Sequence, residues 1–555
     1  MGPIYDSMVH SRGVAWRHLL TDGGARRRGL VALVAAILIA AAVVLMASGG
    51  SSPSPSTPAA GRSAPATGTP TAPTSGASAA APATGAGRRP NIVFVLTDDL
   101  SMDLLRYMPA VRGLESRGMT FDDYFVSDSL CCPSRASIFT GNFPHDTHVF
   151  TNSGPNGGMG AWIGHQDQLH TFNVALEDAG YRTAMMGKYI NGYLEGAGRS
   201  PVPDDYVPPG WNEWDVAGWG YPEFDYQMNI DGTVHSFGHR PRDYLTSVLA
   251  RRGVRFIDRA AHSTKPFFLE LATFSPHYPY TPAPQDAHKF KGLQAPRPPS
   301  FDTLPTNPPS WLANHPPLSA RQIDQINRAF RRRVQAVQSV DRMITAIEAA
   351  LRRDHLTGNT YVVFSSDNGL HTGEYRMMPG KLTAFDTDIH VPLVIAGPGV
   401  PADSTTDAMT ENVDLADTFA AMGGTSMSTD GHSLVPLLDG QAPFDWRSAI
   451  LVEHHHPMPS VDDPDEQNDV SGNPPSYEAM RTRRFLYVEY IDGEREFYDL
   501  QNDPYELHNL AGSLPPAELE RLHNDLARLE DCHGAAACWA AGHVAGLLNA
   551  THTRH

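Results

Sequence analysis

A continuous apolar run and four further strand-like runs predict buried strands in the larger, N-terminal part of the chain. Continuous apolar runs, unlike alternating ones, are typical of parallel strands that helices cover on both faces. The runs lie at residues 92–96, 182–186, 266–274, 359–365 and 390–396. Between them, apolar residues recur at helical spacing, most clearly from Ser319 to Arg353. The alternation predicts an α/β fold with a large mixed, mostly parallel sheet covered by helices.

The pattern changes after residue 443, where short alternating segments replace the continuous apolar runs. These segments predict strands at 449–453, 477–483, 485–490 and 495–499, followed by a helix over 516–530. Asp492-Gly493 has the composition of a hairpin turn and lies between the last two strands. We therefore expect a main domain over residues 89–443 and a smaller C-terminal α+β domain over 444–555.

The N-terminal part of the chain predicts export. Three arginines, Arg26 to Arg28, precede an apolar run of 18 residues, which spans about 27 Å as a helix, close to a bilayer core of about 30 Å. We expect a cytoplasmic segment over 1–29 and an uncleaved membrane anchor over 30–48, with a cleaved export signal as the alternative. Residues 49–88 are rich in Ser, Pro, Ala and Thr and are expected to form a disordered linker. With either an anchor or a cleaved signal, the remaining chain is expected outside the cytoplasm, anchored in the membrane or secreted.

Composition narrows the functional classes. The chain has 555 residues and is 41% hydrophobic, which excludes a disordered protein overall. Its net charge of -18 argues against nucleic-acid binding, because no surplus of cations is available to neutralise phosphates. An anionic substrate must then be attracted by a local cluster of cations or by a metal ion. Two of the four cysteines, Cys532 and Cys538, predict a short disulfide loop in an exported protein.

Two of the predicted strands are followed by oxygen-bearing side chains. Asp98-Asp99 follows the strand at 92–96, and Asp367-Asn368 follows the strand at 359–365. In open α/β sheets, ligands bind beyond the carboxyl ends of the strands. Each pair alone also fits a turn or a helix cap. Together they offer hard oxygen ligands, which favour Ca²⁺ or Mg²⁺ over Zn²⁺.

The two remaining cysteines are adjacent, in the sequence Leu-Cys-Cys-Pro-Ser-Arg-Ala-Ser-Ile-Phe-Thr-Gly at residues 130–141. Pro133 can start a helix as its first residue, which would place Cys131 at the N-terminal end of that helix. Helix amides and Arg135 favour negative charge on a nucleophile at this position. A purely structural role is the alternative for an adjacent cysteine pair.

This sequence resembles the sulfatase family, whose pattern is Cys-x-Pro-Ser-Arg with Thr-Gly a few residues later. Cys131 is in register, because Cys132 would place Ser where the pattern has Pro. The resemblance covers nearly all of residues 89–540 and is strongest to N-acetylglucosamine-6-sulfatases. It implies an alkaline-phosphatase-like fold, a divalent cation, and oxidation of Cys131 to formylglycine by a formylglycine-generating enzyme. The metal ligands that it implies are Asp98, Asp99, Cys131, Asp367 and Asn368.

The resemblance also implies a set of cations around a sulfate group. The catalytic residues that it implies are Cys131, Arg135, Lys188, His277 and Lys381. The chain has only five lysines, so the occurrence of two at these positions is informative. Many sulfatases have a histidine two residues after the first of these lysines, whereas this chain has Ile190. Asn191, His148 and His371 are the candidates to replace that histidine.

The activity that the resemblance implies is hydrolysis of sulfate monoesters. One hydroxyl of the formylglycine hydrate would attack sulfur and displace the alcohol. The second hydroxyl would then lose its proton as sulfate leaves and the aldehyde forms again. The expected substrate is a sulfated small molecule or glycan, with 6-O-sulfate on N-acetylglucosamine-type sugars favoured. The loops at 200–240 and 276–316 and the segment 454–456 are expected to set specificity.

Three other functions stay compatible with the sequence. A phosphoester or phosphonate hydrolase of the same superfamily could use the same pocket. An unmodified Cys131 would leave a weak hydrolase or a non-catalytic sugar-binding wall protein. A thiol peptidase that uses Cys131 and a histidine is the third, and it leaves the acidic strand ends unexplained.

Overall fold

A ten-stranded sheet forms the centre of the computed structural model, in the order β11-β2-β10-β9-β1-β8-β4-β5-β6-β7. The inner strands β9, β1, β8, β4 and β5 run parallel, whereas β10 and β6 pair antiparallel with their neighbours. The strands are β1 (Asn91–Thr97), β2 (Met119–Phe121), β4 (Arg182–Gly187), β5 (Glu213–Ala217), β6 (Gln227–Ile230), β7 (Thr233–Ser236), β8 (Phe267–Ala272), β9 (Thr360–Ser366), β10 (Leu393–Ala396) and β11 (Ser404–Thr406). The mixed, mostly parallel sheet expected from the apolar runs is confirmed.

The structure describes residues 88–194, 200–441, 445–456, 463, 465 and 467–544. Residues 1–87 lie outside this described part of the chain. They comprise the expected cytoplasmic segment (1–29), the expected anchor or export signal (30–48) and all of the expected linker (49–88) except residue 88. Within these described ranges, no helix has both the length and the apolar character needed to cross a membrane.

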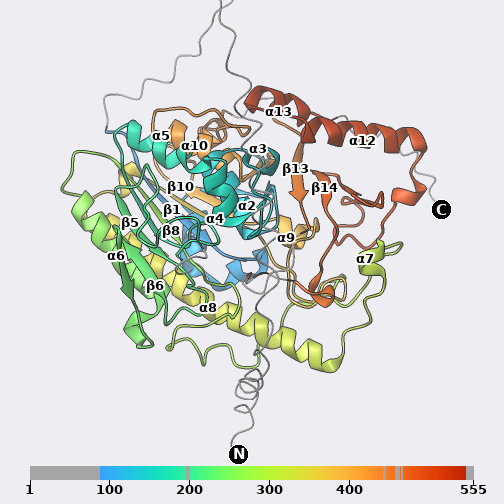
Figure 1. Cartoon of the computed structure of the whole chain (residues 1–555), viewed down its shortest axis with the longest axis horizontal. Coiled ribbons are helices and arrows are strands. Elements are labelled where there is room, and N and C mark those ends of the chain that lie inside the picture. The colour runs from blue at the N-terminus through green and yellow to red at the C-terminus, as the bar shows by residue number, and fades with distance from the viewer. Residues whose placement is uncertain are drawn as a thin grey trace, which may run out of the picture. The chain divides into compact units, whose positions relative to one another are not determined.

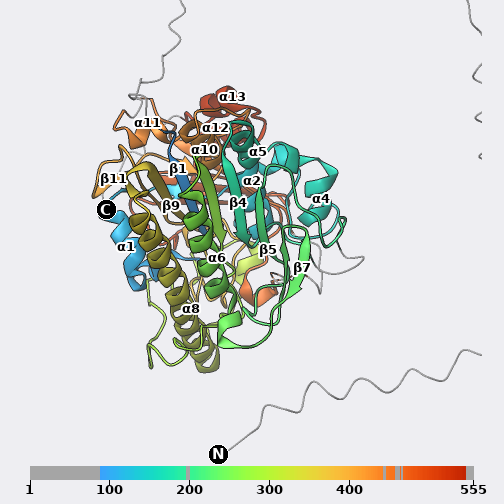
Figure 2. The same cartoon turned by 90° about the vertical axis from the view of Figure 1, so that its left-hand side faces the viewer.

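Helices cover both faces of the sheet, as the continuous apolar runs predict. In β1, Ile92 and Phe94 belong to one hydrophobic cluster and Val93 and Val95 to another, on the opposite face. One face carries α1 (Pro109–Glu115), α6 (Leu245–Ala260) and α8 (Ala320–Arg353), and the other carries α2 (Cys131–Thr140), α5 (Phe172–Asp178) and α10 (Asp414–Met422). Figure 2 shows α6 and α8 side by side across the first face. The middle strands are therefore shielded from water on both sides.

Short elements complete the main part of the chain. A two-stranded sheet pairs β3 (Tyr124–Phe125) with β12 (Thr410–Glu411). The short helices are α3 (Pro144–Thr147), α4 (Gly158–Gly164), α7 (Ser310–Ala313), α9 (Asp386–Ile389) and α11 (Val435–Leu438). Single 3₁₀ turns lie at Met102–Tyr107, Asp167–Leu169, Pro241–Asp243, Thr357–Asn359, Asp469–Ser471 and Ala511–Ser513.

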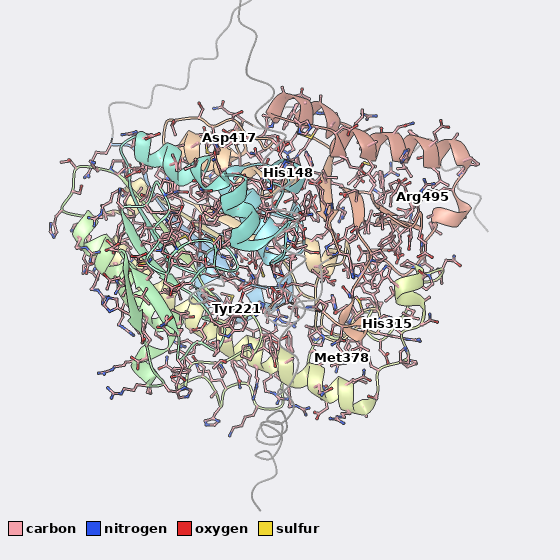
Figure 3. The ribbon with its side chains drawn as sticks, viewed as in Figure 1. His148, Tyr221, His315, Met378, Asp417 and Arg495 are labelled. Carbon is pink, nitrogen blue, oxygen red and sulfur yellow. A yellow bond between two sulfur atoms is a disulfide. The ribbon has the colours of Figure 1, made fainter. Side chains whose placement is uncertain are left out.

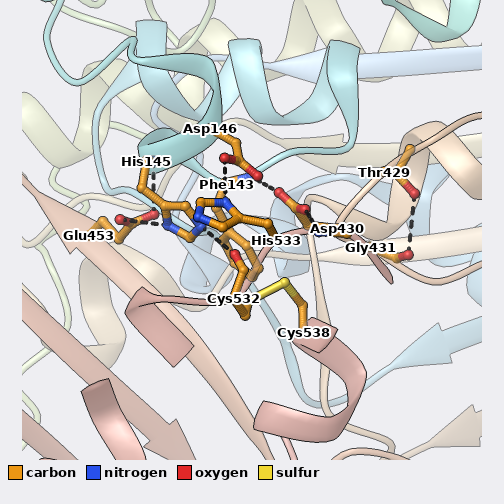
Figure 4. Close-up of a disulfide and its surroundings, with 11 residues drawn as sticks. Phe143, His145, Asp146, Thr429, Asp430, Gly431, Glu453, Cys532, His533 and Cys538 are labelled. Atoms are coloured by element: carbon orange, nitrogen blue, oxygen red, sulfur yellow. Dashed lines mark hydrogen bonds and ion pairs between the residues drawn. A yellow bond between two sulfur atoms is a disulfide. The ribbon is translucent and has the colours of Figure 1, made fainter. Parts of the chain in front are cut away.

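A second sheet, with four antiparallel strands, lies in the C-terminal part of the chain (Figure 1). Its strands are β13 (Ala449–His454), β14 (Tyr477–Thr482), β15 (Phe485–Tyr490) and β16 (Arg495–Asp499), in chain order. Helices α12 (Pro516–Glu530) and α13 (Ala535–Ala541) follow, and a disulfide joins Cys532, just after α12, to Cys538 within α13 (Figure 4). The predicted disulfide loop and the separate antiparallel sheet are confirmed.

The expectation of one long loop over residues 200–240 is wrong. That stretch contains β5, β6 and β7, which extend the main sheet at one edge. These strands have only four or five residues, and β7 is largely exposed, so their apolar signal is weak. Residues 276–316 do form a long connection, whose only helix or strand is α7. The long helix begins one residue later than expected, because Ser319 caps it and exchanges hydrogen bonds with Gln322.

Candidate functional site

Strand register brings the two acidic strand ends together. β1 and β9 are hydrogen-bonded parallel neighbours, and Thr97 pairs with Ser366 at their carboxyl ends. The next residues therefore meet. The Asn368 side-chain amide donates to Asp99 Oδ1 at 2.7 Å, and the Asp99 backbone N–H donates to Asp367 Oδ1 at 3.2 Å. Four oxygen-bearing side chains from two distant segments thus converge, as the sequence predicts, at Asp98, Asp99, Asp367 and Asn368.

Helix α2 begins at Cys131 and directs this residue into the same place. Cys131 Sγ lies 3.1 Å from Asp98 Oδ1 and 2.9 Å from Lys381 Nζ. One turn later, Arg135 Nε donates to Asp367 Oδ2 at 2.8 Å, and both side chains are fully buried. The helix ends at Gly141, whose φ of 75° and contact with Thr429 leave no room for a side chain. The N-terminal position predicted for Cys131 is confirmed.

Two buried lysines pair with the aspartates beside Cys131. Lys188, just after β4, places Nζ 2.7 Å from Asp98 Oδ2, and Lys381 places Nζ 2.6 Å from Asp99 Oδ1. Burial disfavours the charged form of Lys188, but Asp98, together with smaller effects of Cys131 and Tyr221, outweighs it and raises the pKa well above its usual range. For Lys381, Asp465 and Asp99 outweigh burial and raise the pKa in the same way. Both lysines are therefore cations at neutral pH.

His277 completes the cluster from the loop after β8. Its Nε2 lies 2.6 Å from Asp465 Oδ1 and 3.6 Å from Asp99 Oδ2. Its Nδ1 donates to the backbone oxygen of Tyr278 at 2.7 Å. Burial opposes protonation, but Asp99 and Asp465 raise the pKa of His277 to about 9. The ring is accordingly an imidazolium that can donate from both nitrogens at neutral pH.

The charge on the thiol of Cys131 differs from the expectation. The position at the helix start and near Arg135 predicts a stabilised thiolate, but the pKa of Cys131 is raised well above its usual value. Burial is the main cause, and the carboxylates of Asp465 and Asp98 add to it. These effects outweigh Lys188 and Lys381, so the unmodified cysteine is a neutral thiol. Its environment does not activate it as a thiol nucleophile.

The cluster fits a hard cation. Asn368 is fully buried and its Oδ1 has no hydrogen-bond partner, although buried amide oxygens nearly always have one. Ligand atoms of Asp98, Asp99, Cys131 and His277 lie within 4.8 Å of one another. An unpaired amide oxygen beside several carboxylates is a donor set for Ca²⁺ or Mg²⁺ rather than for a soft metal. Asp98, Asp99, Asp367 and Asn368 could therefore hold such an ion.

Two residues of the site were not predicted. Asp465 accepts hydrogen bonds or ion pairs from His277, from Lys381 Nζ at 2.8 Å, and from the amide of Asn152 at 2.7 Å. Asn152 in turn accepts from the backbone N–H of Cys132 at 3.0 Å. Asp465 belongs to a run of acidic residues at 462–466, and nothing in that run distinguishes the carboxylate that reaches the site.

Three residues were candidates to replace the histidine that many sulfatases have at the position of Ile190, and their contacts differ. His371 is held by Asp388 at 3.0 Å and by the backbone oxygen of Ser471 at 3.0 Å, so both its nitrogens are engaged. His148 packs edge-on against His165, with ring centroids 4.8 Å apart. Asn191 donates to the hydroxyl of Tyr221 at 3.3 Å. Since Tyr221 packs on His277, Asn191 is the candidate that this chain of contacts links to the site.

The histidine segment 454–456, expected to contribute to specificity, ranges from buried at His454 to exposed at His456. His454 is fully buried, and neither ring nitrogen has a partner. Burial, with smaller effects of His456 and His455, lowers its pKa to about 3, so the ring is neutral. His455 stacks on Phe150 with ring centroids 3.7 Å apart. His454 and His455 therefore pack against the protein, whereas His456 is exposed.

Comparison with known proteins agrees with the family resemblance of the sequence. The sulfatase family model matches residues 90–425, and the model of the C-terminal region of N-sulphoglucosamine sulphohydrolase matches residues 373–531. The N-acetylglucosamine-6-sulfatase of Homo sapiens is 35% identical over 488 residues, which are 80% of this chain and 85% of that protein. The enzyme of the same name from Capra hircus is 34% identical over 490 residues, 81% of this chain and 85% of its own length.

Solved structures show the same fold. A protein in complex with its substrate D-glucosamine-2-N,6-O-disulfate has a TM-score of 0.64 at 22% identity, and the match covers 80% of this chain and 97% of that one. A phosphonate monoester hydrolase of Agrobacterium radiobacter has a TM-score of 0.58 at 21% identity, covering 76% and 92%. At this level of identity the likeness extends to the fold alone.

Proposed function

Because the chain belongs to the sulfatase family and is a sulfuric ester hydrolase, we propose that it removes 6-O-sulfate from N-acetylglucosamine-type sugars. One observation carries the proposal. A buried cysteine lies among oxygen ligands from two strand ends and within reach of two buried lysines. Relatives that are 34–35% identical over most of their length bear the name N-acetylglucosamine-6-sulfatase.

Binding of the sulfate group falls to Lys188, Lys381 and His277. All three are buried cations, and such donors act strongly where water is excluded. The carboxylate of Asp465 lies between His277 and Lys381, which supports the view that a single anion fits there. His277 can also protonate the leaving oxygen, since its Nε2 is the nitrogen that faces this carboxylate.

Residue 131 is the proposed nucleophile after its oxidation to formylglycine. The neutral thiol supports this assignment, because the site suppresses the thiolate that direct attack by cysteine would require. Arg135 holds Asp367 and so fixes one side of the oxygen cluster at 2.8 Å. A divalent cation bound by Asp98, Asp99, Asp367 and Asn368 would stabilise negative charge on the sulfuryl oxygens. Residue 131 would lie beside it.

The proposed substrate and location follow from relatives. The structural neighbour at TM-score 0.64 holds a glucosamine with a 6-O-sulfate group, and the proposed substrate shares that group. Export, with anchoring in the membrane or secretion, rests on residues 1–48, which lie outside the described part of the chain. Before the protein can act as an enzyme, a formylglycine-generating enzyme must oxidise Cys131 within its sequence motif.

A sulfate-release screen tests the proposal. Purified enzyme is given 6-O-sulfated N-acetylglucosamine, N-sulfated glucosamine, an aryl sulfate and a phosphonate monoester, with Ca²⁺ present. We expect the first compound to be turned over fastest and Cys131→Ala to abolish turnover. Cys132→Ala is the matched control, because this equally buried neighbour stands at the variable position of the Cys-x-Pro-Ser-Arg pattern. The peptide around Cys131 should be lighter by about 18 Da than the unmodified sequence.

Each readout can contradict one part of the proposal. Equal sulfate release by the wild type and Cys131→Ala would remove residue 131 from the mechanism. Turnover of the phosphonate monoester without turnover of any sulfate ester would replace the reaction. Release of N-sulfate but not of 6-O-sulfate would keep the reaction and replace the substrate.

A further inference from the structure

An exposed tryptophan lies next to the buried cations. Trp219 is 46% exposed, although large aromatic side chains are usually covered. Among the described residues, three aromatic side chains are this exposed: Trp219, Tyr278 and Tyr505. Trp219 is two residues from Tyr221, and Tyr278 directly follows His277. Two of the three exposed rings are therefore within two residues of a side chain that contacts the buried cations or is one of them.

Ring contacts connect Trp219 to the lysine. Its indole packs edge-on against Tyr221 with centroids 5.2 Å apart, and Lys188 Nζ lies 5.0 Å from the centre of the Tyr221 ring (Figure 3 labels Tyr221). Tyr221 also packs on His277 at 4.6 Å. The indole is thus no more than about 10 Å from the Lys188 ammonium group. One sulfated monosaccharide can bridge such a span.

The backbone on either side of Trp219 is closely packed. A side chain at Gly218 would lie 2.3 Å from the backbone oxygen of Leu194, and one at Gly220 would lie 2.5 Å from the ring of Phe274. Both glycines are therefore required for the close packing of this turn. A rigid turn that holds an apolar ring in water is typical of a preorganised binding surface.

A polar group without a partner lies in the same hollow. Lys188, Asn191, Trp219 and Tyr221 line a cavity of about 20 Å³, which has room for one water-sized group. Asn191 is 8% exposed and its Oδ1 has no hydrogen-bond partner. Such an oxygen can accept one hydrogen bond from an N–H or O–H that enters the cavity.

We propose that Trp219, Tyr221 and Asn191 form a sugar subsite beside Lys188. The apolar face of a sugar ring packs on the Trp219 indole, and one N–H or O–H of the sugar donates to Asn191 Oδ1. Tyr221 is a positioning residue, because it contacts the indole, the Asn191 amide and both cationic side chains. The inference rests on the proposed function, since it assigns the part of the substrate that carries the sulfate group.

Steady-state kinetics test the subsite. With 6-O-sulfated N-acetylglucosamine, Trp219→Ala should raise KM about tenfold and leave kcat within about twofold. Trp219→Phe, which keeps an aromatic ring, should recover most of the affinity. Competitive inhibition by inorganic sulfate should be unchanged, because that ion needs the cations and not the indole. Asn191→Leu should raise KM by a similar factor with the same unchanged sulfate inhibition.

Tyr505→Ala is the matched control. Tyr505 is 42% exposed and lines a separate cavity of about 570 Å³ with Leu370 and His390. Its removal should leave KM unchanged. An unchanged KM in Trp219→Ala, or an equal rise in Tyr505→Ala, would overturn the subsite.

A binding experiment separates this inference from the proposed function. Saturation-transfer NMR with unsulfated N-acetylglucosamine needs no turnover. We expect a signal with the wild type that Trp219→Ala loses. The absence of signal with the wild type overturns the subsite even where sulfate esters are hydrolysed. A signal without hydrolysis of the 6-O-sulfated sugar keeps the subsite and contradicts the proposed function.

Discussion

His145 joins helix α3 to the C-terminal disulfide, and this contact predicts a defined pH dependence of stability (Figure 4). Its Nδ1 lies 3.0 Å from Glu453 Oε1 and its Nε2 lies 2.8 Å from the backbone oxygen of Cys532. Both nitrogens can donate only in the imidazolium form. Burial opposes this form, but the hydrogen bond and charge of Glu453 and the Cys532 carbonyl raise the pKa of His145 to about 9.

The size of the effect follows from linkage. The pKa of His145 is 6.5 in the reference state and about 9 in the folded protein, and one pKa unit corresponds to about 1.4 kcal/mol. The imidazolium therefore contributes about 3 kcal/mol to the free energy of unfolding. Because the folded pKa is the higher one, this contribution is fully present below pH 6.5 and disappears as pH rises through about 9. The side chain is 14% exposed, which keeps screening by solvent modest.

Guanidinium unfolding of the wild type and His145→Gln, with the disulfide intact, measures this contribution. We expect the variant to be less stable by about 3 kcal/mol near pH 6 and by less than about 0.5 kcal/mol near pH 10. His533→Gln is the control, because the His533 side chain is 67% exposed and its pair with Asp146 should contribute about 1 kcal/mol or less. A difference between wild type and His145→Gln that stays constant from pH 6 to pH 10 would refute the reasoning.

Further predictions concern the site and a buried histidine. Lys381→Met should lower kcat by roughly 10²–10³-fold, whereas Lys289→Met, at a half-exposed lysine paired with Asp286, should not. Asp465→Asn should strengthen competitive inhibition by inorganic sulfate roughly tenfold, because the carboxylate that pairs with His277 and Lys381 is removed. Chelation of divalent cations should abolish turnover and lower the melting temperature, and Ca²⁺ should restore both. His454 has a folded pKa of about 3, so the wild type loses stability as pH falls from 6.5 towards 3; in His454→Phe this loss should shrink, as melting temperatures near pH 7 and pH 4.5 would show.

The oxygen cluster could be predicted from the sequence because strand ends carry it. Asp98 and Asp367 each follow an apolar run, and parallel strands place their carboxyl ends at one edge of the sheet. The sequence could not show that β1 and β9 are direct neighbours, which the register of Thr97 and Ser366 establishes. The position of Cys131 was predictable in part, since Pro133 indicated a helix start at this place, although the helix begins two residues earlier, at Cys131 itself.

Other features depend on contacts that no local pattern encodes. The weakly apolar strands β5 to β7 become ordered by pairing with the edge of an existing sheet. The raised pKa of the Cys131 thiol reflects burial together with Asp465, which is 334 residues away in the chain. The helix N-terminus and Arg135 predicted the opposite direction, because local dipoles were the only interactions visible in the sequence.

The position of Asp465 explains how a pocket built for an anion is stable without one. Asp98 pairs with Lys188 and Asp99 with Lys381, but His277 adds a third buried cation beside them, and these cations would repel one another if no further carboxylate were present. The carboxylate of Asp465 contacts two of them and carries one negative charge, which is also the charge of a sulfate monoester. When the sulfate group of the substrate replaces the Asp465 carboxylate, the local charge stays the same. Substrate binding therefore has to displace a hydrogen-bonded carboxylate, and it does not have to neutralise unpaired cations. This exchange is the reason why removal of Asp465 should strengthen sulfate binding: inorganic sulfate then no longer has to displace a carboxylate from His277 and Lys381.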